Sequence, residues 1–206
     1  MSQRLKVPPT KSSLLALRRQ ENFLQEGYTL LERKRDLLTR LVYERLNRYR
    51  RLRIEVRDAL VNAYRWLAII QLRMGSRSLH QAALGSIPAL QVNIFPRSSL
   101  GVEYPAVSAE LRPLQPVGLM GTDASFDEAR DHLARLTIIL ANLGEAEMAL
   151  RRMLAEQRKT QKRVNALKYN VIPRYQATIH FIQSSLEEEE RNTLFQTKLL
   201  CKQDVA

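Results

Sequence analysis

Residues 14–73 read LLALRRQENFLQEGYTLLERKRDLLTRLVYERLNRYRRLRIEVRDALVNAYRWLAIIQLR, and this stretch decides the fold. Alternate steps of three and four residues from Leu14 to Arg73 pass through eighteen positions, of which fourteen are apolar. Such a seven-residue repeat is typical of a coiled-coil seam and implies a left-handed supercoil. We therefore predict one helix over residues 12–74, roughly 90 Å long at about 1.5 Å per residue. Arg35 and Arg45 interrupt the seam, where a charge usually fixes register.

A second helical arm is predicted over residues 125–198. Ser125 and Glu128 have the spacing of a capping box, with Ser125 as the N-cap. Apolar residues follow a seam as far as Leu154, and nine mostly polar or basic residues then interrupt it. From Val164 onward the apolar steps are mostly fours, so the supercoil should straighten there.

Pro173 lies inside this second arm. Proline removes one backbone hydrogen bond, so it kinks a helix or ends it. Apolar periodicity continues beyond the proline, which favours a kink, while a break into two helices is the alternative.

The middle of the chain, residues 75–124, is rich in proline and glycine. The pieces Leu90 to Phe95 and Val102 to Tyr104 have the composition of short strands, and Ser98, Ser99 and Gly101 between them suit a turn. We predict a small irregular or β-hairpin tip capping an all-α, antiparallel two-helix coiled coil.

In such a hairpin, residue i pairs with residue 200 minus i, approximately, because the two arms have similar lengths. This rule places Lys11 near the acidic run Glu187 to Glu190. It also places the arginine-rich stretch Arg45 to Arg57 beside residues 143–157, which predicts a positive collar midway along the rod.

The formal net charge of +12 favours anionic partners such as nucleic acid, lipid headgroups or an acidic protein surface. A charged run on a long helix is also typical of a solvated face. The longest apolar run, Trp66 to Ile70, is too short to cross a bilayer. The lone Cys201 and the scattered histidines form no metal-binding or catalytic pattern, so we expect no catalytic residue, metal or cofactor.

Two segments resemble a known family. Residues 27–38, GYTLLERKRDLL, resemble the G-x-x-L-L-x-x-K-R-D-x-L motif of the D subunit of V-type and A-type rotary ATPases. Residues 163–174, RVNALKYNVIPR, resemble the R-V-N-A-L-E-x-x-x-I-P-R signature of the same family, with Lys168 where the family commonly has Glu. The resemblance covers both helical arms in the right order.

This resemblance implies a non-catalytic subunit, the central-stalk rotor shaft, which transmits torque between an ATP-hydrolysing or ATP-synthesising hexamer and an ion-translocating membrane ring. The implied partners are the catalytic and regulatory subunits of the hexamer, the small F subunit and a funnel-shaped subunit that leads to the ring. The resemblance implies neither a nucleic-acid partner nor a segment that spans the membrane. The location it implies is cytoplasmic and peripheral to the membrane, as part of a membrane-bound complex. The partner-contact candidates are Lys34, Arg35, Asp36, Arg163, Asn165, Pro173 and Arg174.

Two rival interpretations remain open at this point. A basic coiled coil could bind nucleic acid or an anionic membrane through its arginines, with binding that falls steeply as salt rises. A secretion-system stalk would share the long hairpin shape, although it offers no reason for the RVNAL and VIPR match. Arg35 in turn could serve only to fix the register of the helices, without contacting a partner.

Overall fold

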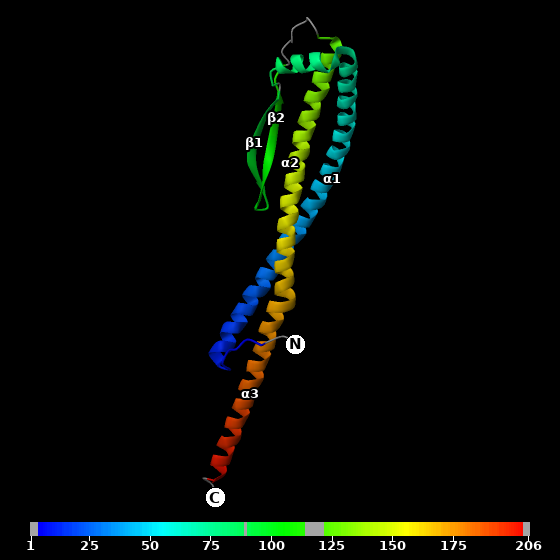
Figure 1. Ribbon diagram of the computed structural model, residues 1–206. Helices are drawn as coiled ribbons and strands as arrows, with labels where there is room; N and C mark the ends of the chain where they lie inside the picture. The colour runs from blue at the N-terminus through cyan, green and yellow to red at the C-terminus, as the bar shows by residue number, and fades with distance from the viewer. Residues whose placement is uncertain (1–3, 89, 114–121, 204–206) are drawn as a thin grey trace. The chain divides into compact units, whose positions relative to one another are not determined.

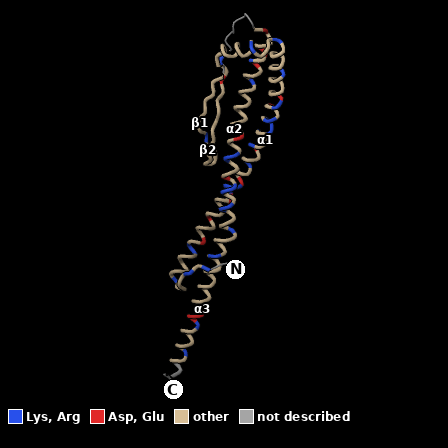
Figure 2. Tube along the Cα trace, viewed as in Figure 1, with Lys and Arg blue, Asp and Glu red and all other residues tan. Residues whose placement is uncertain are grey.

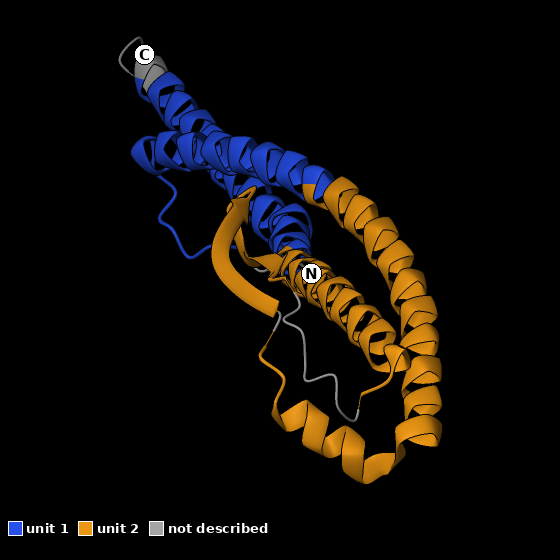
Figure 3. Ribbon diagram, turned by 90° about the horizontal axis from the view of Figure 1, so that it is seen from above, with its two compact units in different colours: residues 1–37, 157–206 blue, residues 38–156 orange. Residues whose placement is uncertain are grey.

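The computed structural model describes residues 4–88, 90–113 and 122–203. Its fold is mostly helical, with a long helical hairpin and a small two-stranded antiparallel sheet in the middle of the chain, as predicted (Figure 1). The chain divides into two compact units, which are described separately: residues 1–37 with 157–206 form unit 1, and residues 38–156 form unit 2 (Figure 3). In chain order the elements are α1 (Lys11–Leu84), β1 (Leu90–Ser99), β2 (Val102–Leu111), α2 (Ala124–Ala166), the π-helix η1 (Leu167–Val171) and α3 (Ile172–Gln203).

Helix α1 has a clear start and an internal interruption. The Thr10 hydroxyl oxygen accepts the Ser13 backbone N–H at 3.2 Å, which is the usual N-cap arrangement. Gly75 has φ 75° and ψ 157°, which lie outside the helical region and interrupt the helix. Glycine suits this position because it adopts a positive φ at no steric cost. Helical turns then continue to Leu84, so the segment that we expected to be irregular from residue 75 begins with helix.

In unit 1, the start of α1 packs against α3 in the opposite direction. Leu17, Ile179 and Ile182 form its buried core, and the Lys11 ammonium lies 2.7 Å from the Glu190 carboxylate. These partners sum to about 200, as the antiparallel rule predicted. Further apolar residues cover this core: Leu5, Val7, Leu14, Tyr175 and Leu186.

Unit 2 pairs α1 with α2 in the same antiparallel sense. The Trp66 and His132 rings stack with centroids 5.8 Å apart, and Arg73 Nη1 lies 2.9 Å from Asp123 Oδ2. The pairing rule therefore holds here as well. The unit has a buried apolar cluster that joins the two helices to strand β2: Leu38, Val102, Tyr104, Ala149 and Met153.

The β-hairpin was predicted, but its position was not. Leu100 (φ 51°) and Gly101 (φ 76°) form the two-residue loop, with the two positive φ angles of a type I′ turn. The strands are longer than the predicted pieces. Instead of capping the end of the helices, β2 packs against Leu38 of α1 and Met153 of α2, because its apolar face needs a surface on which to be buried (Figure 1).

The predicted N-cap of the second arm was wrong. Helix α2 begins at Ala124, and Asp123 makes the capping contacts: its side chain accepts the Ala124 N–H at 2.8 Å and its carbonyl accepts the Phe126 N–H at 2.8 Å. Ser125 is buried inside the first turn, where its hydroxyl donates to Asp123 Oδ2 at 2.8 Å. A carboxylate placed just before the first turn also faces the positive end of the helix dipole.

Pro173 does not end the second arm, since no residue from Ala124 to Gln203 leaves the helical state. The disturbance takes the form of the π-helix η1, in which the Ile172 N–H donates to the Leu167 carbonyl. Pro173 follows in the first turn of α3, where a missing N–H costs least. The alternative of a break into two helices is therefore wrong.

Candidate partner-contact surfaces

The first three candidates lie in unit 1, near the end of its α1 segment. The Arg35 guanidinium donates from Nε and Nη2 to Asp36 Oδ1 at 2.9 and 2.8 Å, and Nη2 lies 3.4 Å from Glu32 Oε1. The carboxylates raise the pKa of Arg35, chiefly through the hydrogen bond to Asp36. Lys34 and Arg35 are half-buried and Asp36 is exposed. The group forms a charged surface on one stretch of helix.

The remaining candidates lie at the other arm of the same unit. Arg163 and Asn165 are exposed, and Asn165 Oδ1 accepts a hydrogen bond from Gln161 Nε2 at 2.8 Å. Pro173 and Arg174 are half-buried at the start of α3. These residues flank η1, so polar side chains lie on both sides of this π-helix.

An unexpected contact fixes the N-terminal segment of unit 1. The Leu5 backbone N–H donates to the Thr178 hydroxyl at 3.0 Å, and that buried hydroxyl donates to the Arg174 carbonyl at 2.7 Å. The Arg4 guanidinium lies 4.6 Å from the centroid of the Phe181 ring. Thr178 therefore joins the segment before α1 to α3, a role that no local sequence signal announces.

Three polar contacts anchor the β-hairpin to the helices of unit 2. Arg45 Nη2 donates to the Tyr104 hydroxyl at 3.0 Å, and its guanidinium lies 5.2 Å from that ring's centroid. The buried Glu145 carboxylate accepts the Val107 N–H at 2.8 Å. Arg152 Nη1 donates to the carbonyl of residue 103 at 2.9 Å. Arg45, which the sequence placed at an interruption of the seam and at the start of the arginine-rich stretch, thus has a specific partner in β2.

The exposed side of α1 in unit 2 is basic and interspersed with apolar residues. Figure 2 shows Lys and Arg recurring along this helix. Ile54, Val61 and Tyr64 are 55, 61 and 61% exposed, and the exposed Arg50 and Arg57 lie among them. The buried positions of the same helix, such as Val56, Ala63 and Ile70, face the opposite side. An apolar stripe with basic edges is suited to an acidic partner surface.

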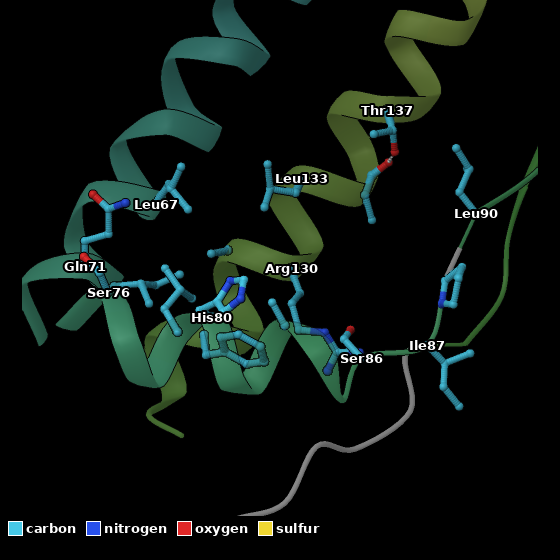
Figure 4. Close-up of a pocket in the computed structure, with 17 residues that line it drawn as sticks. Leu67, Gln71, Ser76, His80, Ser86, Ile87, Leu90, Arg130, Leu133 and Thr137 are labelled. Atoms are coloured by element: carbon cyan, nitrogen blue, oxygen red, sulfur yellow. Dashed lines mark hydrogen bonds between the residues drawn. The ribbon is translucent and has the colours of Figure 1, made fainter. Parts of the chain in front are cut away.

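Unit 2 also contains a pocket of about 630 Å³ between the helical turns after Gly75 and the start of α2 (Figure 4). Its lining is mainly apolar, with Leu67, Ile87 and Leu133 among the contributors, and His80 and Arg130 add polar groups.

Within the described residues, no group of three or more His, Cys, Asp or Glu side chains could hold a metal ion. Among the described helices, none combines the length and apolarity required to cross a membrane.

Comparison with known proteins decides the family. The family model for the ATP synthase D subunit matches residues 13–202. The chain belongs to the ATP synthase D subunit family. It is 34% identical over 200 residues to the A-type ATP synthase D subunit of Methanosphaera stadtmanae, covering 95% of this chain and 94% of that one. It is 34% identical over 203 residues to the V-type ATP synthase D subunit of Thermotoga neapolitana, covering 98 and 100%.

A third relative, the A-type ATP synthase D subunit of Pyrococcus furiosus, is 31% identical over 202 residues, covering 96% of this chain and 94% of that one. Matches of this extent include both helical arms and the β-hairpin, so membership in the D subunit family applies to the whole fold. The chain is accordingly a component of a multi-subunit rotary ATPase or ATP synthase.

Proposed function

We propose that this chain is the central-stalk rotor shaft of a V/A-type ATPase and transmits torque between the catalytic hexamer and the ion-translocating membrane ring. The single observation that carries the proposal is membership in the D subunit family over residues 13–202. The chain itself contributes no catalytic residue in this proposal. It works at the cytoplasmic side, peripheral to the membrane, within a membrane-bound complex.

The internal construction of each unit supports such a role. A shaft must resist bending and twisting, and paired helices with a continuous apolar seam resist both better than a single helix does. Fully buried residues recur on the paired faces of unit 2, including Leu38, Ala63 and Met153. Lys and Arg side chains recur along the outer side of α1 in unit 2 (Figure 2), and hydrated charges of this kind suit a part that turns past changing neighbours.

The proposed contacts with the catalytic and regulatory subunits are made by Lys34, Arg35, Asp36, Arg163 and Asn165, beside Pro173 and Arg174. Their charges and hydrogen-bonding groups would meet hexamer loops whose conformation depends on the bound nucleotide. The basic exposed side of α1 in unit 2 is proposed to receive a partner at the side of the shaft, the small F subunit. The funnel-shaped subunit completes the connection to the ring.

Two measurements test the proposal. The chain should co-purify with the rotary ATPase hexamer in one copy per complex. In that complex, the triple variant Lys34→Ala, Arg35→Ala, Arg163→Ala should keep ATP hydrolysis but lose ion transport. A control that removes the same three positive charges elsewhere, R77A/R97A/R112A, should remain coupled. Normal coupling in the first variant would contradict the assignment of these residues as hexamer contacts. Absence of the chain from the complex would contradict the proposed function.

A further inference from the structure

The π-helix η1 changes which backbone groups of the second arm are paired. In a regular α-helix the Ile172 N–H would donate to the Lys168 carbonyl, but here it donates to the Leu167 carbonyl. The Tyr169 carbonyl would in the same way accept from residue 173, which is proline and has no N–H. The carbonyls of Lys168 and Tyr169 have therefore both lost the donor that a regular helix supplies.

The stretch of unit 1 that carries these two carbonyls is accessible. None of the residues of η1 is buried, and the Tyr169 side chain is 71% exposed. The Lys168 ammonium lies 5.6 Å from the centroid of the Tyr169 ring, so the two exposed side chains stand together. Helix carbonyls without an intrahelical donor are satisfied by water, by side chains or by a ligand. A partner that brings hydrogen-bond donors to η1 can therefore bind there without disturbing the helix.

The charge around η1 is positive, and its own arm does not balance it. Residues 157–186 contain six Lys or Arg side chains and no Asp or Glu, and Lys168 among them is exposed. By the antiparallel rule, the acidic residues opposite are Glu32 and Asp36 of α1. Both of these carboxylates already accept hydrogen bonds from Arg35. The surface around η1 is therefore complementary to acidic groups from outside the chain.

We propose that the η1 surface, formed by Lys162, Arg163, Lys168, Tyr169 and the two carbonyls of η1, binds an acidic loop of the hexamer. The carboxylates of that loop pair with the lysine and arginine side chains, in charge-assisted hydrogen bonds. Its backbone or side-chain N–H groups donate to the carbonyls of Lys168 and Tyr169. The assignment of the loop to the hexamer rests on the proposed function, which already places Arg163 against hexamer loops.

The combination of cations with open carbonyl acceptors favours a protein loop over a polyanion. A nucleic-acid backbone or an anionic membrane presents phosphate oxygens, which pair with Lys and Arg. Carbonyl oxygens carry partial negative charge, so they repel those same phosphate oxygens. A polypeptide loop carries N–H donors close to its carboxylates, and it can satisfy both kinds of group at once.

A photo-crosslinking amino acid in place of Tyr169, in the purified complex, identifies the occupant of the η1 surface. We expect a crosslink to an acidic loop of a hexamer subunit, located by mass spectrometry. The same group in place of the exposed Gln176 of α3 should leave that loop unlabelled. A crosslink to nucleic acid, to lipid, to a second copy of this chain or to nothing would overturn the inference and leave the proposed function intact. Absence of the chain from the complex would overturn both.

Charge reversal tests the cationic half of the η1 surface. Lys168→Glu should weaken binding of the full chain to the purified hexamer by roughly tenfold, because like charges opposed across an interface are costly. The matched control is Lys159→Glu, at an exposed lysine of the same basic run, which should bind as the unsubstituted chain does. Replacing an acidic residue of the crosslinked loop by lysine should restore binding of the Lys168→Glu chain. Equal binding by the two variants would overturn docking at η1.

The substitution Pro173→Ala tests the acceptor half of the same surface. Alanine supplies the N–H that a regular helix directs at the Tyr169 carbonyl, so it removes an acceptor and leaves every charge in place. We expect binding to the hexamer to weaken by about threefold to tenfold, the equivalent of one lost hydrogen bond, with the helical circular-dichroism signal retained. Unchanged binding, or weaker binding together with a loss of helical signal, would overturn the role of the carbonyls.

Discussion

Leu37 and Leu38 are adjacent leucines on α1, and they test the register of the seam directly. Leu38 is fully buried against Tyr104 and Met153, whereas Leu37 is 49% exposed. Substituting a buried leucine by alanine removes three carbons and leaves a cavity, at a cost of about 3 to 5 kcal/mol. The same change at a half-exposed site of a helix costs less than about 1 kcal/mol, because alanine is itself a strong helix former.

The assay is equilibrium urea unfolding followed by the fluorescence of Trp66, the chain's single tryptophan. Trp66 stacks on His132 within unit 2, the unit to which Leu38 belongs, so its emission reports the loss of that helix pairing. In a parallel thermal unfolding experiment, a loss of about 3 kcal/mol in the free energy of unfolding should lower the midpoint of a chain of this size by roughly 6 to 12 °C. Comparable losses for L37A and L38A, or a larger loss for L37A, would refute the assigned register.

Three further outcomes are expected. Leu100→Asn should stabilise the hairpin by about 1 kcal/mol in urea unfolding, because asparagine tolerates the positive φ that costs leucine about 1 to 2 kcal/mol. Glu145→Ala should leave the Val107 N–H without its acceptor, at a cost of about 1 to 3 kcal/mol, and should raise the exchange rate of that amide at least tenfold. Hydrogen bonds, first from Arg73 and then from Ser125, lower the pKa of Asp123 in the folded chain. The ionised carboxylate therefore stabilises the folded chain at pH values above the ordinary aspartate pKa of about 4. This stabilisation is lost as the pH falls further and the carboxylate becomes protonated. Thermal midpoints measured from pH 7 to pH 3 should show that loss in the unsubstituted chain and a smaller one in Asp123→Asn.

The helical pairing was predictable because it depends on a repeated local pattern. Leu17, Leu38, Val56, Ala63 and Ile70 were all seam positions, and all are buried. A period of three and four residues specifies which side of a helix is apolar, and equal arm lengths then set the antiparallel register. The β-hairpin itself was also predictable from its strand and turn composition.

The position of the hairpin could not be predicted in the same way. It depends on contacts between residues far apart in sequence, such as Arg45 with Tyr104 and Glu145 with Val107. Neither an arginine at a seam position of α1 nor a glutamate within α2 gives a local sign of its tertiary partner in β2. The capping error has a similar origin, because Asp123 is fixed partly by Arg73, fifty residues earlier. Likewise, the family motifs offered Arg35 and Arg163 only as candidate contacts, and the hydrogen bond from the Leu5 N–H to the Thr178 hydroxyl joins residues far apart in sequence.

The π-helix explains how the seam of unit 1 passes Pro173. Val164 and Ile172 are both buried, although eight residues of regular helix would rotate the second side chain about 80° past the first at about 100° per residue. In a π-helix each residue turns by roughly 15° less, so the five residues of η1 recover about 75° and return Ile172 to the buried side. The change of period that the sequence showed beyond Val164 is therefore compensated by backbone geometry. No residue of η1 itself is buried, so the contribution of the π-helix is to return the buried positions of α3 to the side that Val164 occupies before the proline.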